Sequence, residues 1–405
     1  MADLKTEPPK KTSYDVVIVG GAMYGSSIAS FLMHNPDFDA SVLVVERDPG
    51  YENSATARTN SCIRQQFSNE INVRISQFGA EYIKNFRSFM DNDSRVPEVT
   101  LQSYGYMYMA GNEQSAAIMR ECQQIQADCG AATKFMLPED IARDYPFYNL
   151  EGVVGANHNK VDEGYFDGNT LFDWWKRTAR EKGVEYIANE VTAMTLNNAG
   201  TQVESVTLKS GEIVSCGTVV NASGTRGAVT ARMAGIKIPI EPRLRYTFIF
   251  AAEKPLNRDL PLTIDPSGVH MRTDGQYYMA GCPGYSDPAV DFDDFTIDHS
   301  VWEEKAWPAI ANRIPQFEAI KLMNTWMGQY DYNTLDQNAI TGRHPKVSNF
   351  VFANGFSGHG FQQSPAIGRG TSEVIIYNEY RTLDLSPLGY DRIARNEPFL
   401  EKAII

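Results

Sequence analysis

The sequence has no two cysteines at the C-x-x-C spacing, and its five cysteines are an odd number. Disulfide frameworks use paired cysteines, and structural zinc sites take ligands at short repeated spacings. We therefore expect neither a disulfide framework nor a metal site. A reducing compartment fits the cysteines best.

Long apolar runs and an excess of basic residues are also missing. No stretch approaches the roughly 18 consecutive apolar residues of a membrane-spanning helix. The chain carries 37 lysines and arginines against 50 acids, a net charge of −13, so its average surface repels phosphate. We expect no membrane span and no nucleic-acid partner. The first residues mix charges with Pro8 and Pro9, which predicts a disordered tail over 1–13, no targeting signal and a cytoplasmic location.

Length and pattern predict domains built from separated segments. At about 150 residues per domain, 405 residues suggest two or three domains. Strands and helices alternate near both ends of the chain, whereas 104–109, 243–252 and 277–280 are β-rich and aromatic. The expected fold class is α/β plus α+β. We predict a discontinuous dinucleotide-binding domain over 14–95, 162–236 and 337–405, and an antiparallel-sheet substrate domain over 96–161 and 237–336.

Residues 15–32 predict a strand, a tight turn and a helix. The apolar run ending at Val19 breaks into Gly20, Gly21, Ala22 and Gly25, which fits the dinucleotide-binding pattern G-x-A-x-x-G. Gly20 permits the turn, and Gly25 lets the helix and the strand pack closely. Ala22 stands where the middle glycine is usual.

A second apolar run, 41–45, ends in Glu46 and completes a strand–helix–strand unit. A carboxylate at this place accepts hydrogen bonds from a ribose 2′-hydroxyl and repels a 2′-phosphate. Arg47 is a further candidate for the same site, with a solvated surface charge as its alternative. The unit predicts an adenine dinucleotide, either NAD or FAD.

A glycine-rich loop over 354–363 precedes a second helix. Ser364 is a good N-cap and Pro365 a good first helical residue, so the helix is expected to start there. Its positive end would face the loop and stabilise negative charge, as on the N1 and C2-carbonyl edge of a reduced flavin. This favours FAD over NAD, although glycines that merely permit turns explain the loop equally well when it is taken alone.

Five dispersed strings together resemble the D-amino-acid oxidase superfamily, which includes sarcosine oxidases and dehydrogenases, dimethylglycine dehydrogenase and glycine oxidase. They are Gly-Gly-Ala-Met-Tyr-Gly at 20–25, Val-Glu-Arg-Asp-Pro at 45–49, Cys-Ile-Arg-Gln-Gln-Phe at 62–67, Asn-Ala-Ser-Gly at 221–224 and Gly-Phe-Ser-Gly-His-Gly-Phe at 355–361. Strings at 243–246 and 330–334 are similar to one branch of it, the FAD-dependent oxidoreductase-domain proteins that assist assembly of respiratory complex I, with their bacterial relatives.

The resemblance implies a discontinuous Rossmann-type FAD domain and a substrate domain whose antiparallel sheet covers the flavin. It also implies a set of cofactor-binding residues at matching positions. These are Gly20, Gly21, Ala22, Gly25, Glu46, Arg47, Thr59, Asn60, Ser61, Ile63, Val191, Ala222, Gly224, Gly355, Ser357, Gly358, His359, Gly360, Phe361 and Gln362.

Departures from the family pattern narrow the active-site candidates, which are Arg64, Tyr246, Tyr330, His359 and Gln362. Arg64 matches the substrate arginine of sarcosine oxidases, and a structural arginine is its alternative. Tyr330 stands near the carboxylate-binding arginine of D-amino-acid oxidases, and Gln362 replaces a lysine of sarcosine oxidases. For His359, hydrogen bonding to the flavin or the loop is favoured over proton transfer.

Secondary candidates lie in the β-rich segments. They are Arg243, Arg245, His270 and Tyr277. For the tyrosines, including Tyr246, aromatic core packing explains the pattern equally well.

These features predict an FAD-dependent amine oxidoreductase that oxidises the C–N bond of an amino acid or N-alkyl amino acid. A hydride would pass to flavin N5, and the imine product would hydrolyse. Two other functions stay open: a non-catalytic FAD-binding assembly factor and an NAD-linked dehydrogenase. The oxygen-activating lysine of monomeric sarcosine oxidases is replaced around 278–281, so a protein or quinone acceptor is expected rather than oxygen. A homo-oligomer is a further possibility.

The FAD should be bound without a covalent link, because residues 327–330, where sarcosine oxidases attach flavin through a cysteine, contain none. Acid precipitation of the purified protein should therefore release the yellow colour, measured as visible absorbance in the supernatant. A pellet that keeps its flavin through acid and denaturing electrophoresis would contradict this prediction.

Overall fold

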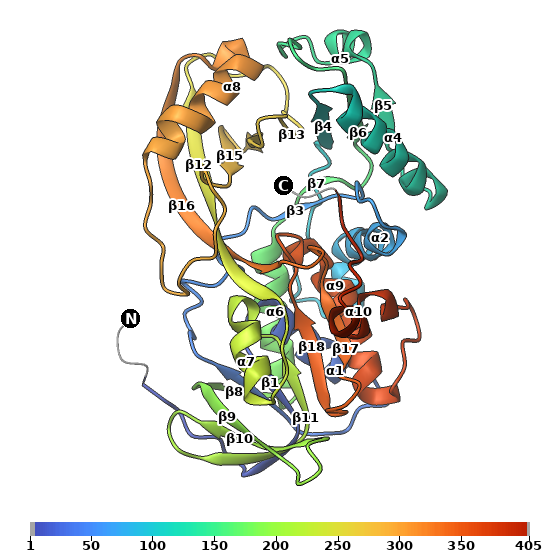
Figure 1. Cartoon of the computed structure of the whole chain (residues 1–405), viewed down its shortest axis with the longest axis vertical. Helices are drawn as coiled ribbons and strands as arrows, with labels where there is room; N and C mark the ends of the chain where they lie inside the picture. Colours follow the sequence, from blue (N-terminus) through green and yellow to red (C-terminus); the bar gives the residue numbers. More distant parts are fainter. Residues whose placement is uncertain (1–4, 403–405) are drawn as a thin grey trace.

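The computed structural model describes residues 5–402 and builds them around two sheets (Figure 1). The ends of the predicted segments, 1–4 and 403–405, lie outside the described residues. The first sheet has the order β17-β18-β11-β1-β2-β8, with β10 and β9 attached beside β11. Its strands are β1 (Ser13–Val19), β2 (Val42–Glu46), β8 (Glu185–Ala188), β9 (Val191–Leu196), β10 (Val203–Leu208), β11 (Ile213–Asn221), β17 (Ile340–Arg343) and β18 (Phe350–Asn354).

The centre of this sheet is parallel and covered on both faces. β1 pairs in parallel with β2 and β11, and β11 pairs in parallel with β18. Val16 and Ile18 of β1 pack into one hydrophobic core, and Val17 and Val19 pack into another. Alternate residues of one strand thus reach opposite faces, which explains the continuous apolar run in the sequence.

Helices cover one face, and a helix and two strands cover the other. The helical layer contains α1 (Met23–His34), α2 (Glu70–Lys84), α6 (Gly168–Glu181) and α9 (Gly360–Tyr377). The opposite core is closed by β9, β10 and α7 (Gly227–Met233). This is the α/β architecture predicted for the dinucleotide-binding half.

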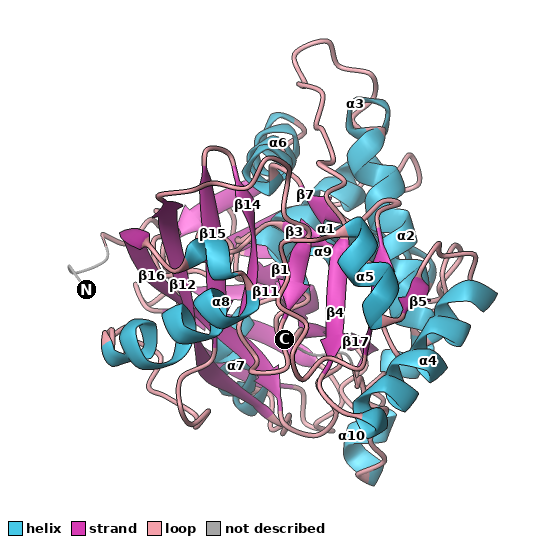
Figure 2. Cartoon of the chain, turned by 90° about the horizontal axis from the view of Figure 1, so that it is seen from above, coloured by secondary structure: helices cyan, strands magenta, loops and turns pink. Residues whose placement is uncertain are grey.

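The second sheet has the order β16-β12-β15-β14-β13-β4-β6-β5, and only its β13–β4 pair is parallel. Helices α4, α5 and α8 lie along it (Figure 2). Its elements are β4 (Tyr106–Ala110), α4 (Glu113–Asp128), β5 (Lys134–Met136), α5 (Pro138–Asp144), β6 (Gly155–Asn159), β12 (Ile240–Ala252), β13 (Leu262–Ile264), β14 (His270–Asp274), β15 (Tyr277–Cys282), α8 (Trp307–Arg313) and β16 (Ile320–Asn333).

Smaller elements join these parts. They are β3 (Cys62–Ile63) paired with β7 (Gly164–Tyr165), α3 (Phe86–Phe89), α10 (Asp391–Arg395), the short 3-10 helices Gly224–Arg226, Pro315–Phe317 and Ser386–Leu388, and the π-helical turn Val301–Ala306.

The chain passes from the first sheet to the second and back twice. Strands of the first sheet come from residues 13–46, 185–221 and 340–354, and those of the second from residues 106–159 and 240–333. The domain boundaries drawn from the sequence stay a prediction.

The described residues before β1 lie along β8, at one edge of the first sheet. Glu7 N donates a hydrogen bond to Ala188 O (2.9 Å), and Lys10 N donates to Glu185 Oε1 (2.8 Å). The sequence predicted a disordered tail over 1–13, but Glu7 and Lys10 are hydrogen-bonded to β8. The reason is that an edge strand leaves backbone groups unpaired, and this segment supplies partners for them.

Candidate active site

A cavity opens where the carboxyl ends of strands in the first sheet meet the second sheet. Its lining includes Val19 at the end of β1, Glu46 at the end of β2 and Ala222 just after β11. Arg245 of β12 and Tyr330 of β16 line it from the second sheet. Ligands of open α/β sheets bind at such strand ends, so this cavity is the candidate site.

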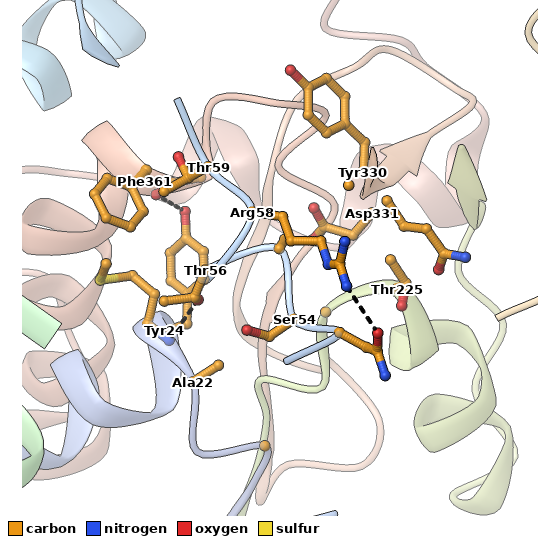
Figure 3. A pocket seen from close by; sticks show the side chains of 18 of the residues that line it. Ala22, Tyr24, Ser54, Thr56, Arg58, Thr59, Thr225, Tyr330, Asp331 and Phe361 are labelled. Carbon is orange, nitrogen blue, oxygen red and sulfur yellow. Dashed lines mark hydrogen bonds between the residues drawn. The ribbon is translucent and has the colours of Figure 1, made fainter. Parts of the chain in front are cut away.

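Two glycines make the turn between β1 and α1 possible. Gly20 has φ +99°, and a Cβ there would lie 2.4 Å from Ala222 O. A Cβ on Gly25 would lie 1.9 Å from Gly20 O, so no larger residue fits at either place. α1 starts after Ala22 with no side-chain cap, and such a helix end favours a phosphate. Ala22 and Tyr24 lie beside the cavity in Figure 3.

The Glu46 carboxyl group is fixed at the end of β2. It accepts hydrogen bonds from Gly21 N (Oε2, 2.7 Å) and Asp48 N (Oε1, 2.7 Å). Burial raises the pKa of Glu46, and these two backbone bonds oppose the rise. Each carboxylate oxygen has a second lone pair, so both can still accept a ribose hydroxyl. Gly21 does not line the cavity itself and acts by holding Glu46.

Asp331 of β16 holds the glycine loop in shape. Asp331 Oδ2 accepts from Gly355 N (2.9 Å), and Asp331 O accepts from Ser357 N (3.2 Å). Gly355 and Gly358 have φ +75° and +92°, and a Cβ on Gly358 would lie 2.3 Å from the Tyr330 ring. Burial raises the pKa of Asp331 to about 6. Figure 3 shows Tyr330 and Asp331 on the same side of the cavity.

α9 begins at Gly360, so the predicted start at Ser364 and Pro365 is wrong. Pro365 lacks the N–H that would bond to Phe361 O in a continuous helix. The Ser364 hydroxyl donates to that oxygen instead, at 2.8 Å. The helix therefore extends toward the cavity, and its positive end lies at residues that line it.

Arg64, just after β3, lines the same cavity and is almost fully buried, with 2% of its surface exposed. Its Nη2 lies 3.0 Å from His359 Nε2, its Nε donates to Gln66 O at 3.2 Å, and its backbone N donates to Gln362 Oε1 at 2.8 Å. The guanidinium also lies over the Phe67 ring, 4.3 Å from its centroid. These contacts join the loop after β3 to the start of α9.

His359 is neutral in this arrangement. Burial, and then the Arg64 charge, lower its pKa well below the usual value. Because a guanidinium only donates, His359 Nε2 must accept, and the ring proton is assigned to Nδ1.

Strand alternation separates the candidates on β12. Arg245 and Thr247 line the cavity, and Arg245 is paired with Asp287 through Nη1 (2.6 Å) and Nη2 (3.0 Å). Tyr246, between them, also borders the cavity, but its ring packs in the core of the second sheet, where it stacks on Phe248 with centroids 6.0 Å apart. The phenol of Tyr246 is therefore placed for packing.

Residues 15–374 match the family model described as FAD dependent oxidoreductase (DAO). The chain belongs to this family. This family match indicates FAD rather than NAD, a choice that the glycine motif at 20–25 had left open.

Known proteins across the family are similar over nearly the whole chain. FAD-dependent oxidoreductase domain-containing protein 1 of Xenopus laevis is 36% identical, covering 98% of this chain and 86% of the relative. Sarcosine oxidase subunit beta of an Arthrobacter species is 24% identical, covering 97% and 96%. The crystal structure of L-proline dehydrogenase from P. horikoshii superposes with TM-score 0.82 at 26% identity, covering 96% of this chain and all of that one. The predicted fold class is confirmed.

The residues of the DAO-family site fit FAD. The closely packed turn at Gly20, the Glu46 carboxylate and the loop at 355–360 provide for phosphate, ribose and flavin within one cavity. Most predicted cofactor residues line it: Gly20, Ala22, Glu46, Arg47, Thr59, Asn60, Ser61, Val191, Ala222, Gly224, Ser357, Gly358, His359, Gly360, Phe361 and Gln362. So do Arg64, Tyr246 and Tyr330.

Four predicted residues lie behind the cavity wall: Gly21, Gly25, Ile63 and Gly355. Gly21 and Gly355 donate backbone N–H groups to Glu46 and Asp331, Gly25 permits close packing, and Ile63 is in the helical-layer core.

Three residues that were not predicted from the sequence also line the cavity: Tyr24, Arg58 and Asp331 (Figure 3). Tyr24 stacks on Phe356 (centroids 3.6 Å apart), and its hydroxyl donates to Gly360 O. An acid in the β-rich segment beside Tyr330 was a usable signal for Asp331. Arg58 gave none, since an arginine in a loop is ordinarily solvated.

Within residues 5–402, no helix is long and apolar enough to cross a membrane.

The raised pKa of Asp331 predicts a pH dependence of stability. The native state binds this proton more tightly than the unfolded chain, so its contribution to stability is full below the ordinary pKa of 3.8 and is lost as pH rises through about 6. Relative to Asp331→Asn, the wild type should lose up to about 3 kcal/mol of unfolding free energy over that range. Denaturant unfolding of both proteins between pH 4 and pH 8 measures this difference. A constant difference would contradict the prediction.

Proposed function

We propose that this FAD-dependent oxidoreductase oxidises the C–N bond of an amino acid or N-alkyl amino acid. The observation that carries the proposal is the buried Arg64 guanidinium, which contacts His359 and Gln66 beside the glycine loop. When bound, FAD supplies a hydride acceptor at N5 for the α-hydrogen, and the substrate imine then hydrolyses in water.

Arg64 would bind the substrate carboxylate. A guanidinium is a planar fork that matches a carboxylate with two charge-assisted hydrogen bonds. Its existing contacts with His359 and Gln66 fix its plane, so that little side-chain freedom remains to be lost on binding. Tyr330 lines the same cavity as Arg64 and is a second candidate for contact with the substrate.

The surroundings favour an unprotonated amine. His359 is neutral, and burial lowers the pKa of His270 to about 4, so both rings can accept or donate hydrogen bonds without adding charge. The Arg64 cation disfavours a second positive charge nearby. No residue needs to act as an obligatory general base in this scheme.

The relatives support an amine substrate by their names, sarcosine oxidase subunit beta and L-proline dehydrogenase. Both names specify amino acids with a secondary amine. We therefore propose that the substrate is an amino acid with a secondary amine, with primary amino acids as the alternative.

We further propose a protein or quinone electron acceptor. The cavity lining among the described residues includes Arg47, Arg58, Arg64, Arg226 and Arg245 but no lysine, so the ammonium group that assists oxygen reduction in monomeric sarcosine oxidases has no counterpart there. Rapid peroxide formation in air, at the rate seen with an artificial acceptor, would contradict this. A cytoplasmic location, a non-covalent FAD and a possible homo-oligomer stay predictions.

Substrate-dependent bleaching separates catalysis from the alternative role of a non-catalytic FAD-binding scaffold. Under anaerobic conditions, at least one member of a panel of N-methyl, cyclic, D- and L-amino acids should reduce the bound FAD, measured as loss of its visible absorbance. A protein that stays oxidised across the whole panel would support the scaffold.

Arg64→Ala should lose far more catalytic efficiency with an amino acid than with the matching amine that lacks the carboxylate. Losing one partner of a buried charged pair costs about 2–5 kcal/mol, which is roughly thirtyfold or more in kcat/KM. Arg64→Lys, which keeps the charge but not the fork, should recover only part of the loss. Equal losses with both substrates, or failure to hold FAD, would make Arg64 a structural or flavin-binding residue.

A further inference from the structure

The segment that follows Arg64 is held by a buried carboxyl group from another part of the chain. Glu163, between β6 and β7, has no exposed surface. Its Oε1 accepts from Gln65 N (2.7 Å) and Asn159 Nδ2 (2.9 Å), and its Oε2 accepts from Gln66 Nε2 (2.8 Å). The two residues after Arg64 in the chain are thus both attached to Glu163.

Gln66 connects this carboxyl group to the Arg64 side chain. The Gln66 backbone oxygen accepts from Arg64 Nε at 3.2 Å, while its side-chain amide donates to Glu163 and to Tyr106 O (3.3 Å). Arg64 and Gln66 are each 2% exposed. Buried hydrogen bonds therefore connect the Glu163 carboxyl group to the Arg64 guanidinium through Gln66.

The hydrogen-bonding pattern around Glu163 requires an acceptor at both oxygens. All three neighbours are N–H donors, and an ionised carboxylate accepts them all, whereas an amide would place its own NH2 group against a donor. The charged and titratable side chains that face Glu163 are Arg64, Tyr106 and Tyr108. Burial raises the pKa of Glu163 to about 7, and the three hydrogen bonds and Arg64 oppose that rise.

We propose that Glu163 is a positioning residue that fixes the plane of Arg64 through Gln66 and so sets the affinity of the site for a carboxylate. This positioning role rests on the proposed function in one respect: it takes a carboxylate as the group that Arg64 binds. Glu163 itself touches neither substrate nor flavin in this proposal.

Acetate is a suitable probe, because it carries the carboxylate and cannot be oxidised as an amine. Its Kd is measured at pH 8 from the perturbation of the visible absorption of bound FAD, so no turnover is needed. Glu163→Gln should weaken acetate binding by about tenfold or more while FAD occupancy is retained. If acetate binds but no amine bleaches the flavin, the proposed oxidation fails and the positioning role stands.

A role of Glu163 through charge alone predicts the opposite result. Loss of its negative charge would leave the potential around Arg64 more positive, and acetate would bind more tightly. Tighter or unchanged binding in Glu163→Gln would therefore overturn the proposal, as would a wild type whose spectrum acetate does not perturb.

Two further variants keep the test decisive. Gln66→Met removes the amide that joins Glu163 to Arg64 but leaves the other two donors to Glu163, and it should weaken acetate binding to a similar extent, even if Glu163→Gln does not fold. Asp265→Asn is the matched control, because Asp265 is a buried carboxylate paired with Arg313 (2.6 Å) outside the cavity lining. It should lower stability yet leave the acetate Kd within about twofold.

A double-mutant cycle identifies Arg64 as the group through which Glu163 acts. In an Arg64→Ala background, Glu163→Gln should change the acetate Kd by less than about twofold, because the coupled partner is gone. Additive losses in the two variants would show that Glu163 acts independently of Arg64 and would overturn the proposal.

Discussion

Arg64 places a permanent positive charge inside the protein, and the arrangement around the cavity depends on holding it. Removing an ion from water costs several kcal/mol unless well-placed partners compensate. Two of the groups that contact the guanidinium are Gln66 O, close by in the chain, and His359 Nε2, 295 residues later, while Gln362 accepts from the Arg64 backbone N. The same contacts fix the loop that lines the flavin part of the cavity. The contacts that hold the buried Arg64 cation therefore also shape the cofactor site.

Two arginines of β12 are held by carboxylates. Arg243 pairs with Glu241 and Asp287, and Arg245 makes two contacts with Asp287. Their charges are compensated by carboxylates of the same sheet and the loop after β15. This makes them supports of the cavity wall, with Arg245 also lying against the Tyr330 ring at 4.7 Å.

Local patterns were sufficient for the dinucleotide half of the site. The turn at Gly20 and the acid at Glu46 follow from short-range rules, because strand, turn and helix are neighbours in sequence. The direction of the Tyr246 ring was left open between the site and the core, and the predicted start of α9 was wrong. The first depends on strand register, and the second on a Ser364 hydroxyl that replaces a missing backbone donor. Glu163 binds Gln65 and Gln66, which lie 98 and 97 residues away in the sequence, so its role could not be predicted without the fold.

The double passage of the chain between the two sheets has a consequence for biosynthesis. β18 and the loop after it pair with β11 and Asp331 only once residues 350–357 exist. A nascent chain that ends before Gln362 lacks both the flavin loop and the side chain that holds the Arg64 backbone. On the ribosome the cofactor therefore has no complete site until the chain has been extended past Gln362, and we expect FAD capture to follow that step.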